Sequence, residues 1–103
     1  MAGPMKIRAA SRDGITEVKV LMSHEMETGF RKDATGTLVP AWFIKEVVAK
    51  LNDKVVMQAE WGASISKNPY FVFRIKGGIA GDKIGISWVD TRGETGLGEA
   101  TVT

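Results

Sequence analysis

The run WFIKEVVAKLNDKVVMQAEW, residues 42–61, decides the fold class, because its first half suits either a helix or a strand. Ala, Lys and Glu favour helix, and the apolar residues of 42–51 also fit helical spacing. Four apolar residues nevertheless fall on one face of a strand: Phe43, Val47, Ala49 and Leu51. Ile44 and Val48 then lie on the opposite face. A short polar turn at 52–54 joins this run to VVMQAEW, which predicts a β-hairpin and an all-β chain.

Short runs with period-two alternation lie on both sides of this hairpin. The clearest is YFVFRIK, residues 70–76, with Phe71, Phe73 and Ile75 directed inward. We expect further strands at 5–10, 15–22, 83–90 and 94–103, separated by turn signals such as Asp13-Gly14. The chain is therefore predicted to form one domain over residues 1–103, an immunoglobulin-like two-sheet β-sandwich of about seven strands.

The composition limits the classes of function. The chain has 103 residues, of which 44% are hydrophobic and 25% charged, as in ordinary globular domains. Its net charge is only +2, and its 14 Lys and Arg residues are scattered among 12 acids, so we expect no nucleic-acid partner. No run approaches the length of a membrane span, and MAGPMKIRAA has no apolar signal core. We therefore expect no membrane partner and no signal peptide.

Polar residues gather in LMSHEMETGFRKD, residues 21–33, which holds the only histidine, His24. The segment approaches the zinc-protease pattern HExxH, but Thr28 stands where the second histidine belongs. The chain has no cysteine, and one histidine cannot serve several serines as a catalytic base. We therefore predict no enzyme activity, no metal and no cofactor. Two interpretations of the segment stay open: it binds something, or His24 and nearby acids fix a structural loop.

Four segments resemble the SoxZ family: HEMETGFRKDATGTLVPAWFI (24–44), ISKNPYFVF (65–73), the KGG and GDKI pieces of 76–84, and ISWVDTRGETGLGEA (86–100). The resemblance runs from Ile15 to Thr101 with the segments in the expected order. Two positions depart from the family pattern. Glu25 stands where the family often has proline, and Trp42 stands where it often has histidine.

The resemblance implies a role rather than an activity. SoxZ is the cysteine-free, immunoglobulin-like subunit of the SoxYZ sulfur carrier of bacterial thiosulfate oxidation. Its sister SoxY carries the sulfur substrate on a cysteine, and the pair is presented to Sox cytochrome, hydrolase and dehydrogenase enzymes. The resemblance also implies a periplasmic location, reached by export together with the partner. The alternative from another class is a stand-alone β-sandwich binding module for adhesion or carbohydrate.

We predict that two aromatic-tipped loops serve as docking surfaces for these partners. The candidate residues are His24, Glu27, Phe30, Arg31, Lys32, Asp33, Asn68, Pro69 and Tyr70. Several strands also carry apolar residues on both faces, which indicates that another chain covers one of them. These residues include Ile15, Leu21, Ile44, Val48, Tyr70 and Val72.

Overall fold

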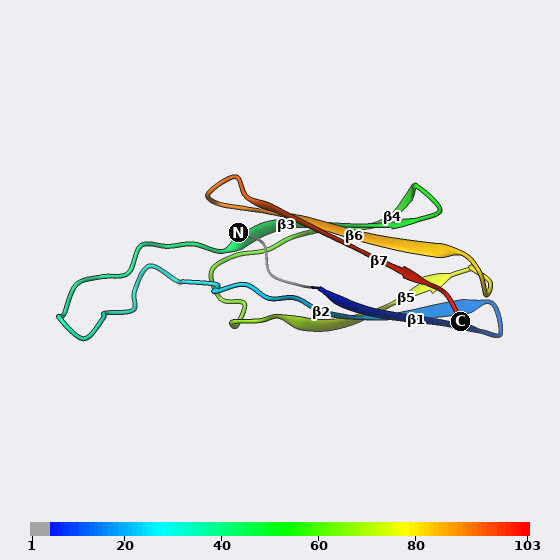
Figure 1. The fold of residues 1–103 in the computed structure, drawn as a ribbon, viewed down its shortest axis with the longest axis horizontal. Helices are drawn as coiled ribbons and strands as arrows, with labels where there is room; N and C mark the ends of the chain where they lie inside the picture. The colour runs from blue at the N-terminus through cyan, green and yellow to red at the C-terminus, as the bar shows by residue number, and fades with distance from the viewer. Residues whose placement is uncertain (1–4) are drawn as a thin grey trace.

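The computed structural model describes residues 5–103 as two packed antiparallel sheets (Figure 1). The strands are β1 (Lys6–Arg12), β2 (Ile15–Leu21), β3 (Ile44–Leu51), β4 (Lys54–Glu60), β5 (Tyr70–Lys76), β6 (Lys83–Asp90) and β7 (Thr95–Thr101). One sheet has the order β1-β2-β5 and the other β4-β3-β6-β7. The predicted immunoglobulin-like β-sandwich is confirmed. The described part of the chain contains no helix long and apolar enough to cross a membrane.

The segment that suited either a helix or a strand forms the hairpin of β3 and β4. Leu51 pairs with Lys54 across the two-residue turn Asn52–Asp53. Both turn residues have positive φ, 48° and 69°, a conformation that Asn and Asp tolerate better than most side chains. The Asn52 side chain also donates to Asp82 and accepts from the Lys83 N–H. This local turn chemistry favours the strand over the helix.

Ile44 lies in the core, although simple alternation places it on the outer face of the sheet. Ile44 pairs with Asp90 while Glu46 pairs with Val89, so β3 has one more residue than β6 between these pairs. The extra residue is Lys45, and such a bulge shifts the alternation of side chains by one position. Ile44 therefore joins Val47 among the fully buried residues. The sequence expectation for Ile44 was wrong because it assumed an unbroken strand.

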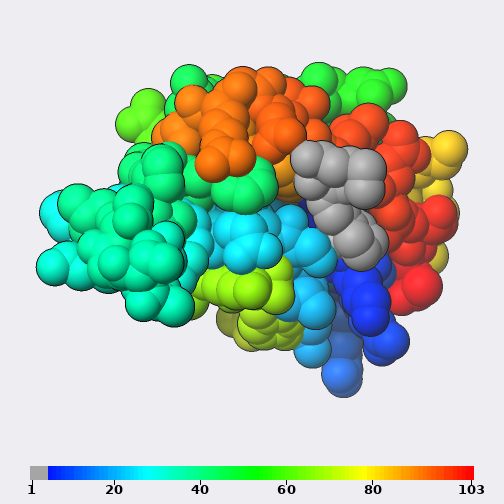
Figure 2. Space-filling view, turned by 60° about the vertical axis from the view of Figure 1, so that its left-hand side comes forward, coloured from blue at the N-terminus to red at the C-terminus, as the bar shows by residue number. Residues whose placement is uncertain are grey.

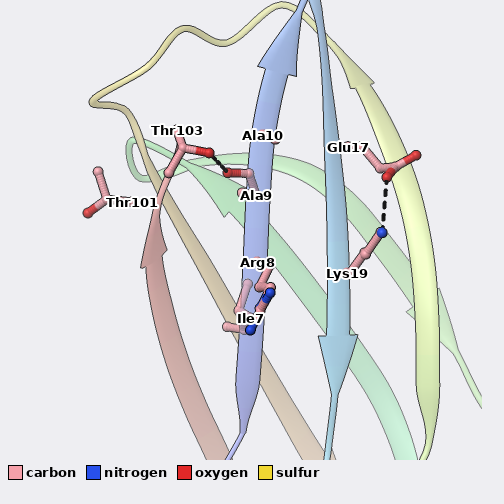
Figure 3. Close-up of a pocket in the computed structure, with 8 residues that line it drawn as sticks. All are labelled: Ile7, Arg8, Ala9, Ala10, Glu17, Lys19, Thr101 and Thr103. Carbon is pink, nitrogen blue, oxygen red and sulfur yellow. Dashed lines mark hydrogen bonds and ion pairs between the residues drawn. The ribbon is translucent and has the colours of Figure 1, made fainter.

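One buried cluster joins the two sheets. From the first sheet it includes Val18 and Val20 of β2 and Met22, which directly follows β2. From the second sheet it includes Ile84, Ile86 and Trp88 of β6. The strands predicted at 15–22 and 83–90 are confirmed, and their buried side chains alternate along each strand. Beside β1, Thr103 donates its N–H to the Ala9 carbonyl at 2.9 Å, and its hydroxyl reaches the same oxygen (Figure 3). The residues after β7 thus pair with the free edge of β1.

Gly96 provides a test of how closely the core is packed. It pairs with Trp88, and a Cβ added at Gly96 would overlap the indole ring. We expect Gly96→Ala to lower the free energy of unfolding by about 2 kcal/mol, because a filled core resists an added methyl group. Urea denaturation measures this change.

Gly85→Ala is the matched control, because Gly85 lies in a strand of the same sheet and has open space around its Cβ position. Its effect should stay within about 0.5 kcal/mol. Equal losses at the two positions would contradict the packing described for Trp88.

Candidate functional site

Between β2 and β3 the chain forms an arm, residues 27–42, that projects from one end of the sandwich (Figure 1). Glu27 and Trp42 exchange both backbone hydrogen bonds at its base, with N···O distances of 2.6 and 3.0 Å. Further out, Val39 donates to Arg31 at 2.8 Å. The predicted polar loop is therefore an irregular two-stranded ribbon. It lengthens a molecule that measures 53 × 20 × 20 Å, and it stands out as a separate lobe in Figure 2.

The tip of the arm is held by its own side chains. Asp33 accepts hydrogen bonds from the Thr35 N–H, the Thr35 hydroxyl and the Thr37 N–H, at 2.9, 2.6 and 3.1 Å. The hydrogen bond from the Thr35 hydroxyl, together with those from the two backbone groups, lowers the pKa of the Asp33 carboxyl. Gly36 completes the turn with a φ of 83°. The tip is thus held in one shape by contacts within the arm itself.

The charged side chains of the arm largely satisfy one another. Arg31 binds Glu27 through two hydrogen bonds, of 3.0 and 2.6 Å, in the forked geometry that suits a guanidinium and a carboxylate. The hydrogen bond from Arg31 lowers the pKa of Glu27, and the same bond raises the pKa of Arg31. The side chain of Phe30, in contrast, is 86% exposed, and Leu38 is also exposed. The arm therefore presents apolar groups beside a compensated ion pair.

His24 anchors the base of the arm from inside the protein. Its Nδ1 accepts from the Met26 N–H at 3.0 Å, and its Nε2 lies 3.0 Å from Asp90 Oδ2. Since Nδ1 is an acceptor, the ring proton sits on Nε2 and is donated to Asp90. Met26 is buried with a φ of 50°, and its sulfur accepts from the Ile44 N–H. The first residues of the arm are thus fixed by buried contacts.

Asp90, at the end of β6, is fully buried and receives four N–H groups. Its Oδ2 accepts from His24 and from the Trp42 indole N–H at 2.7 Å. Its Oδ1 accepts from the backbone N–H groups of Arg92 and Glu94, both at 2.9 Å. Burial alone raises the pKa of Asp90, but the hydrogen bonds, led by the one from His24, outweigh it and lower that pKa.

Aromatic contacts complete the anchor. The His24 ring lies 5.0 Å from the Trp42 ring and 5.1 Å from the Trp88 ring, the latter edge to face. The Arg92 guanidinium lies over the Trp42 ring, 4.0 Å from its centre, a cation–π contact. The Asn68 side chain accepts from the His24 N–H, and the Asn68 N–H donates to the His24 carbonyl. This arrangement holds the arm, the loop at 62–69 and the β6–β7 turn together at one end of the sandwich.

A comparison with protein-family models matches residues 5–101 to the SoxZ family, described as "Sulphur oxidation protein SoxZ". The matched residues include both sheets, the arm and its anchor. The chain belongs to the SoxZ family. The resemblance carried by the four sequence segments is confirmed, and membership gives this SoxZ chain a role in the Sox system of sulfur oxidation. A search among curated proteins returned no match.

The structure separates the nine candidate docking residues of this SoxZ chain into two groups. His24 and Pro69 are buried, so their side chains do not lie on the surface of the chain. Both residues fix the loops from within, and docking through them stays a prediction. Glu27 is partly buried, and the others are exposed: Phe30, Arg31, Lys32, Asp33, Asn68 and Tyr70. For these residues, docking stays a prediction.

The sequence interpretation in which His24 fixes the loop is confirmed, but with different partners. His24 binds Asp90, 66 residues away, rather than the neighbouring acids Glu25 and Glu27. A weak signal for Asp90 was present, because Asp followed by Thr-Arg-Gly is typical of a side chain that caps its own turn. Within residues 5–103 no three His, Asp or Glu side chains are grouped so that they could hold a metal ion. The buried contacts of this site fix the position of the arm.

Asp90→Asn tests the anchor. Each carboxylate oxygen of Asp90 accepts two hydrogen bonds, Oδ2 from His24 and Trp42 and Oδ1 from two backbone N–H groups. Asparagine replaces one of these oxygens by an NH₂ group, so that donors would face donors. We expect a loss of about 3 kcal/mol in the free energy of unfolding. Asp53→Asn, in the exposed β3–β4 turn where Asn also tolerates positive φ, is the control and should change stability little. A similar small effect of both variants in urea denaturation would refute the anchor.

Acid unfolding gives a second test. A lowered carboxyl pKa stabilises the fold above the unfolded value of about 3.9, and this stability is lost as the pH falls through the folded value. Wild type should therefore lose stability steeply below about pH 4. Asp90→Asn should show a shallower slope there, with the remaining slope due to Asp33, Asp82 and Glu27, whose pKa values are also lowered. Identical slopes in pH-dependent urea denaturation would contradict the assignment.

Proposed function

We propose that this chain is the non-catalytic subunit of a sulfur carrier complex, in which it pairs with a cysteine-bearing SoxY-type subunit. The observation that carries the proposal is the family match over residues 5–101. The chemistry of the chain agrees with it. The chain has no cysteine to hold sulfur, and its only histidine engages both ring nitrogens inside the protein. The sulfur cargo therefore belongs on another chain.

In this proposal the complex works in the periplasm, and this chain is exported together with its partner. The chain helps to present the carrier to Sox cytochrome, hydrolase and dehydrogenase enzymes, and the arm provides one contact surface for them. Its preformed tip loses little conformational freedom on binding, which favours association. Burial of the exposed Phe30 side chain would contribute about 2 kcal/mol to such a contact.

The pairing proposal predicts a change of oligomeric state. Apolar side chains are exposed on both sheets, among them Ile15, Val55 and Leu97. Expressed alone, the chain should self-associate, and an equimolar cysteine-bearing subunit should convert it to a heterodimer. Light scattering coupled to size-exclusion chromatography measures both states. A chain that stays monomeric at high concentration and ignores that subunit would instead favour the stand-alone binding module.

The arm proposal predicts a salt-dependent rate. Arg31→Glu with Lys32→Glu makes the arm strongly acidic, so association with at least one Sox enzyme should slow at low salt, and less so at high salt. Pairing with the cysteine-bearing subunit should survive. Stopped-flow measurements at the two salt concentrations give the rates.

Glu27→Arg with Arg31→Glu is the matched control for the arm, because it exchanges the two charges of the ion pair and leaves the net charge unchanged. Its association rates should stay close to those of wild type. If the first double variant associates with every Sox enzyme as fast as wild type at low salt, the arm plays no part in steering these enzymes.

A further inference from the structure

The outward side chains of the β1–β2–β5 sheet form a strongly basic surface, here named the basic face. The strand register brings twelve outward positions of the described strands into four rows of three. Six of them are cations: Lys6, Arg8, Arg12, Lys19, Arg74 and Lys76. Glu17 is the one acid among these twelve. The sequence suggested scattered charges, but folding gathers them.

The charge of the basic face contrasts with that of the rest of the chain. Six cations and one acid give the face a net charge of +5. Because the whole chain has a net charge of +2, all other residues together carry −3. The asymmetry is therefore larger than the overall charge indicates. Such a separation creates a directed field on one side of a small protein.

The charges on the basic face are only partly compensated within the chain, by Glu17 on the face and by Asp13, which lies 3.8 Å from Arg12 at the β1–β2 turn. Glu17 is shared between Arg74, at 3.2 Å, and Lys19, at 3.8 Å. Arg8 lies directly opposite Lys19 in the pairing of β1 with β2, and like charges in opposed positions destabilise a sheet. Figure 3 shows Arg8 on one strand and Glu17 and Lys19 on the next, with the Glu17–Lys19 ion pair dashed. Stability of the fold does not account for this arrangement.

Apolar side chains occupy one corner of the basic face. Leu21 pairs with Tyr70, and Val72 follows on the outward side of β5. Their exposed fractions are 39%, 60% and 44%. The face is thus a sheet surface that combines an apolar corner with separate positive charges. A folded protein can match both parts, because protein surfaces offer carboxylates and apolar atoms together.

We propose that the basic face is a docking surface for a second folded protein with an acidic surface, bound transiently. Permanent interfaces are depleted in charged residues at their centre, whereas uncompensated charges accelerate encounter. Tyr70 is the one aromatic residue among the twelve positions, so the face lacks the stacking platform typical of single-stranded nucleic-acid sites. The proposal is independent of the arm and requires no particular Sox enzyme.

The first experiment maps the binding of an acidic polypeptide. Poly-L-glutamate is titrated into the full-length ¹⁵N-labelled chain, and the backbone amide shifts are followed by NMR. We expect the largest shifts in β1, β2 and β5, with loss of binding at high salt, where the screening length falls to about 3 Å at 1 M. Shifts concentrated on the β4-β3-β6-β7 sheet or on the arm would overturn the proposal.

The second experiment reverses two charges of the face. The double variant is Arg8→Glu with Lys76→Glu. The new carboxylate at position 8 lies opposite Lys19, and the one at position 76 lies near Arg12 and Arg74. Because each new carboxylate keeps cations close to it, folding should be preserved. The dissociation constant for poly-L-glutamate should rise about tenfold or more at low salt, because two attractions become repulsions. Lys50→Glu with Lys54→Glu makes the same change of charge on the other sheet and should shift it by less than about twofold. Equal effects of the two double variants would overturn the proposal.

Two further measurements decide between occupants of the face. Duplex DNA and vesicles containing phosphatidylglycerol are titrated under the same conditions. If either binds at β1, β2 and β5 more tightly than poly-L-glutamate, the occupant of the face is a nucleic acid or a membrane and not an acidic protein. The mapping is then repeated on the complex with the cysteine-bearing subunit. We expect the same shifts in the complex. Their loss would make the basic face the permanent pairing interface and would overturn transient docking.

Discussion

The structure depends on a single buried carboxylate. Asp90 has no exposed surface, and an ionised group in that position is tolerated only when its oxygens are fully hydrogen-bonded. The four N–H groups that satisfy it come from three separate segments: the residues that follow β2, the base of the arm and the β6–β7 turn. Satisfying Asp90 therefore brings these segments together, and it also fixes the tautomer of His24. The arm has its direction because of this requirement.

The sequence predicted those parts of the fold that follow from local rules. Alternation identified the strands β2, β5 and β6 and the inward face of β5, and turn residues such as Asn52 placed the hairpins. What it could not predict depends on distant pairing. The bulge at Lys45, which buries Ile44, is set by the register against β6. The partners His24 and Asp90 stand 66 residues apart, and the basic face exists only after β1 and β5 align on β2.

The two candidate surfaces differ in physical character. The arm is preformed, its ion pair of Glu27 with Arg31 is satisfied internally, and Phe30 is its main unsatisfied feature. Apolar contacts of this kind act mainly on how long a complex lasts, while Arg31 and Lys32 of the arm are proposed to affect the rate of encounter. The basic face offers uncompensated charge, which acts mainly on how fast partners meet. A subunit with the carrier role proposed here would gain from both, since each visit of an enzyme must begin quickly and still allow time for transfer.

The connections of the arm also have a mechanical meaning. Its two strands continue into β2 and β3, which belong to different sheets, and its base is tied to the end of β6 through Asp90. No glycine lies between Met22 and Thr28 to act as a pivot, and Met26 and His24 are held inside the protein. A pull on the tip therefore meets no glycine hinge between the end of β2 and Thr28. It is transmitted as a load to both sheets, so that the arm behaves as a lever rigidly mounted on the sandwich.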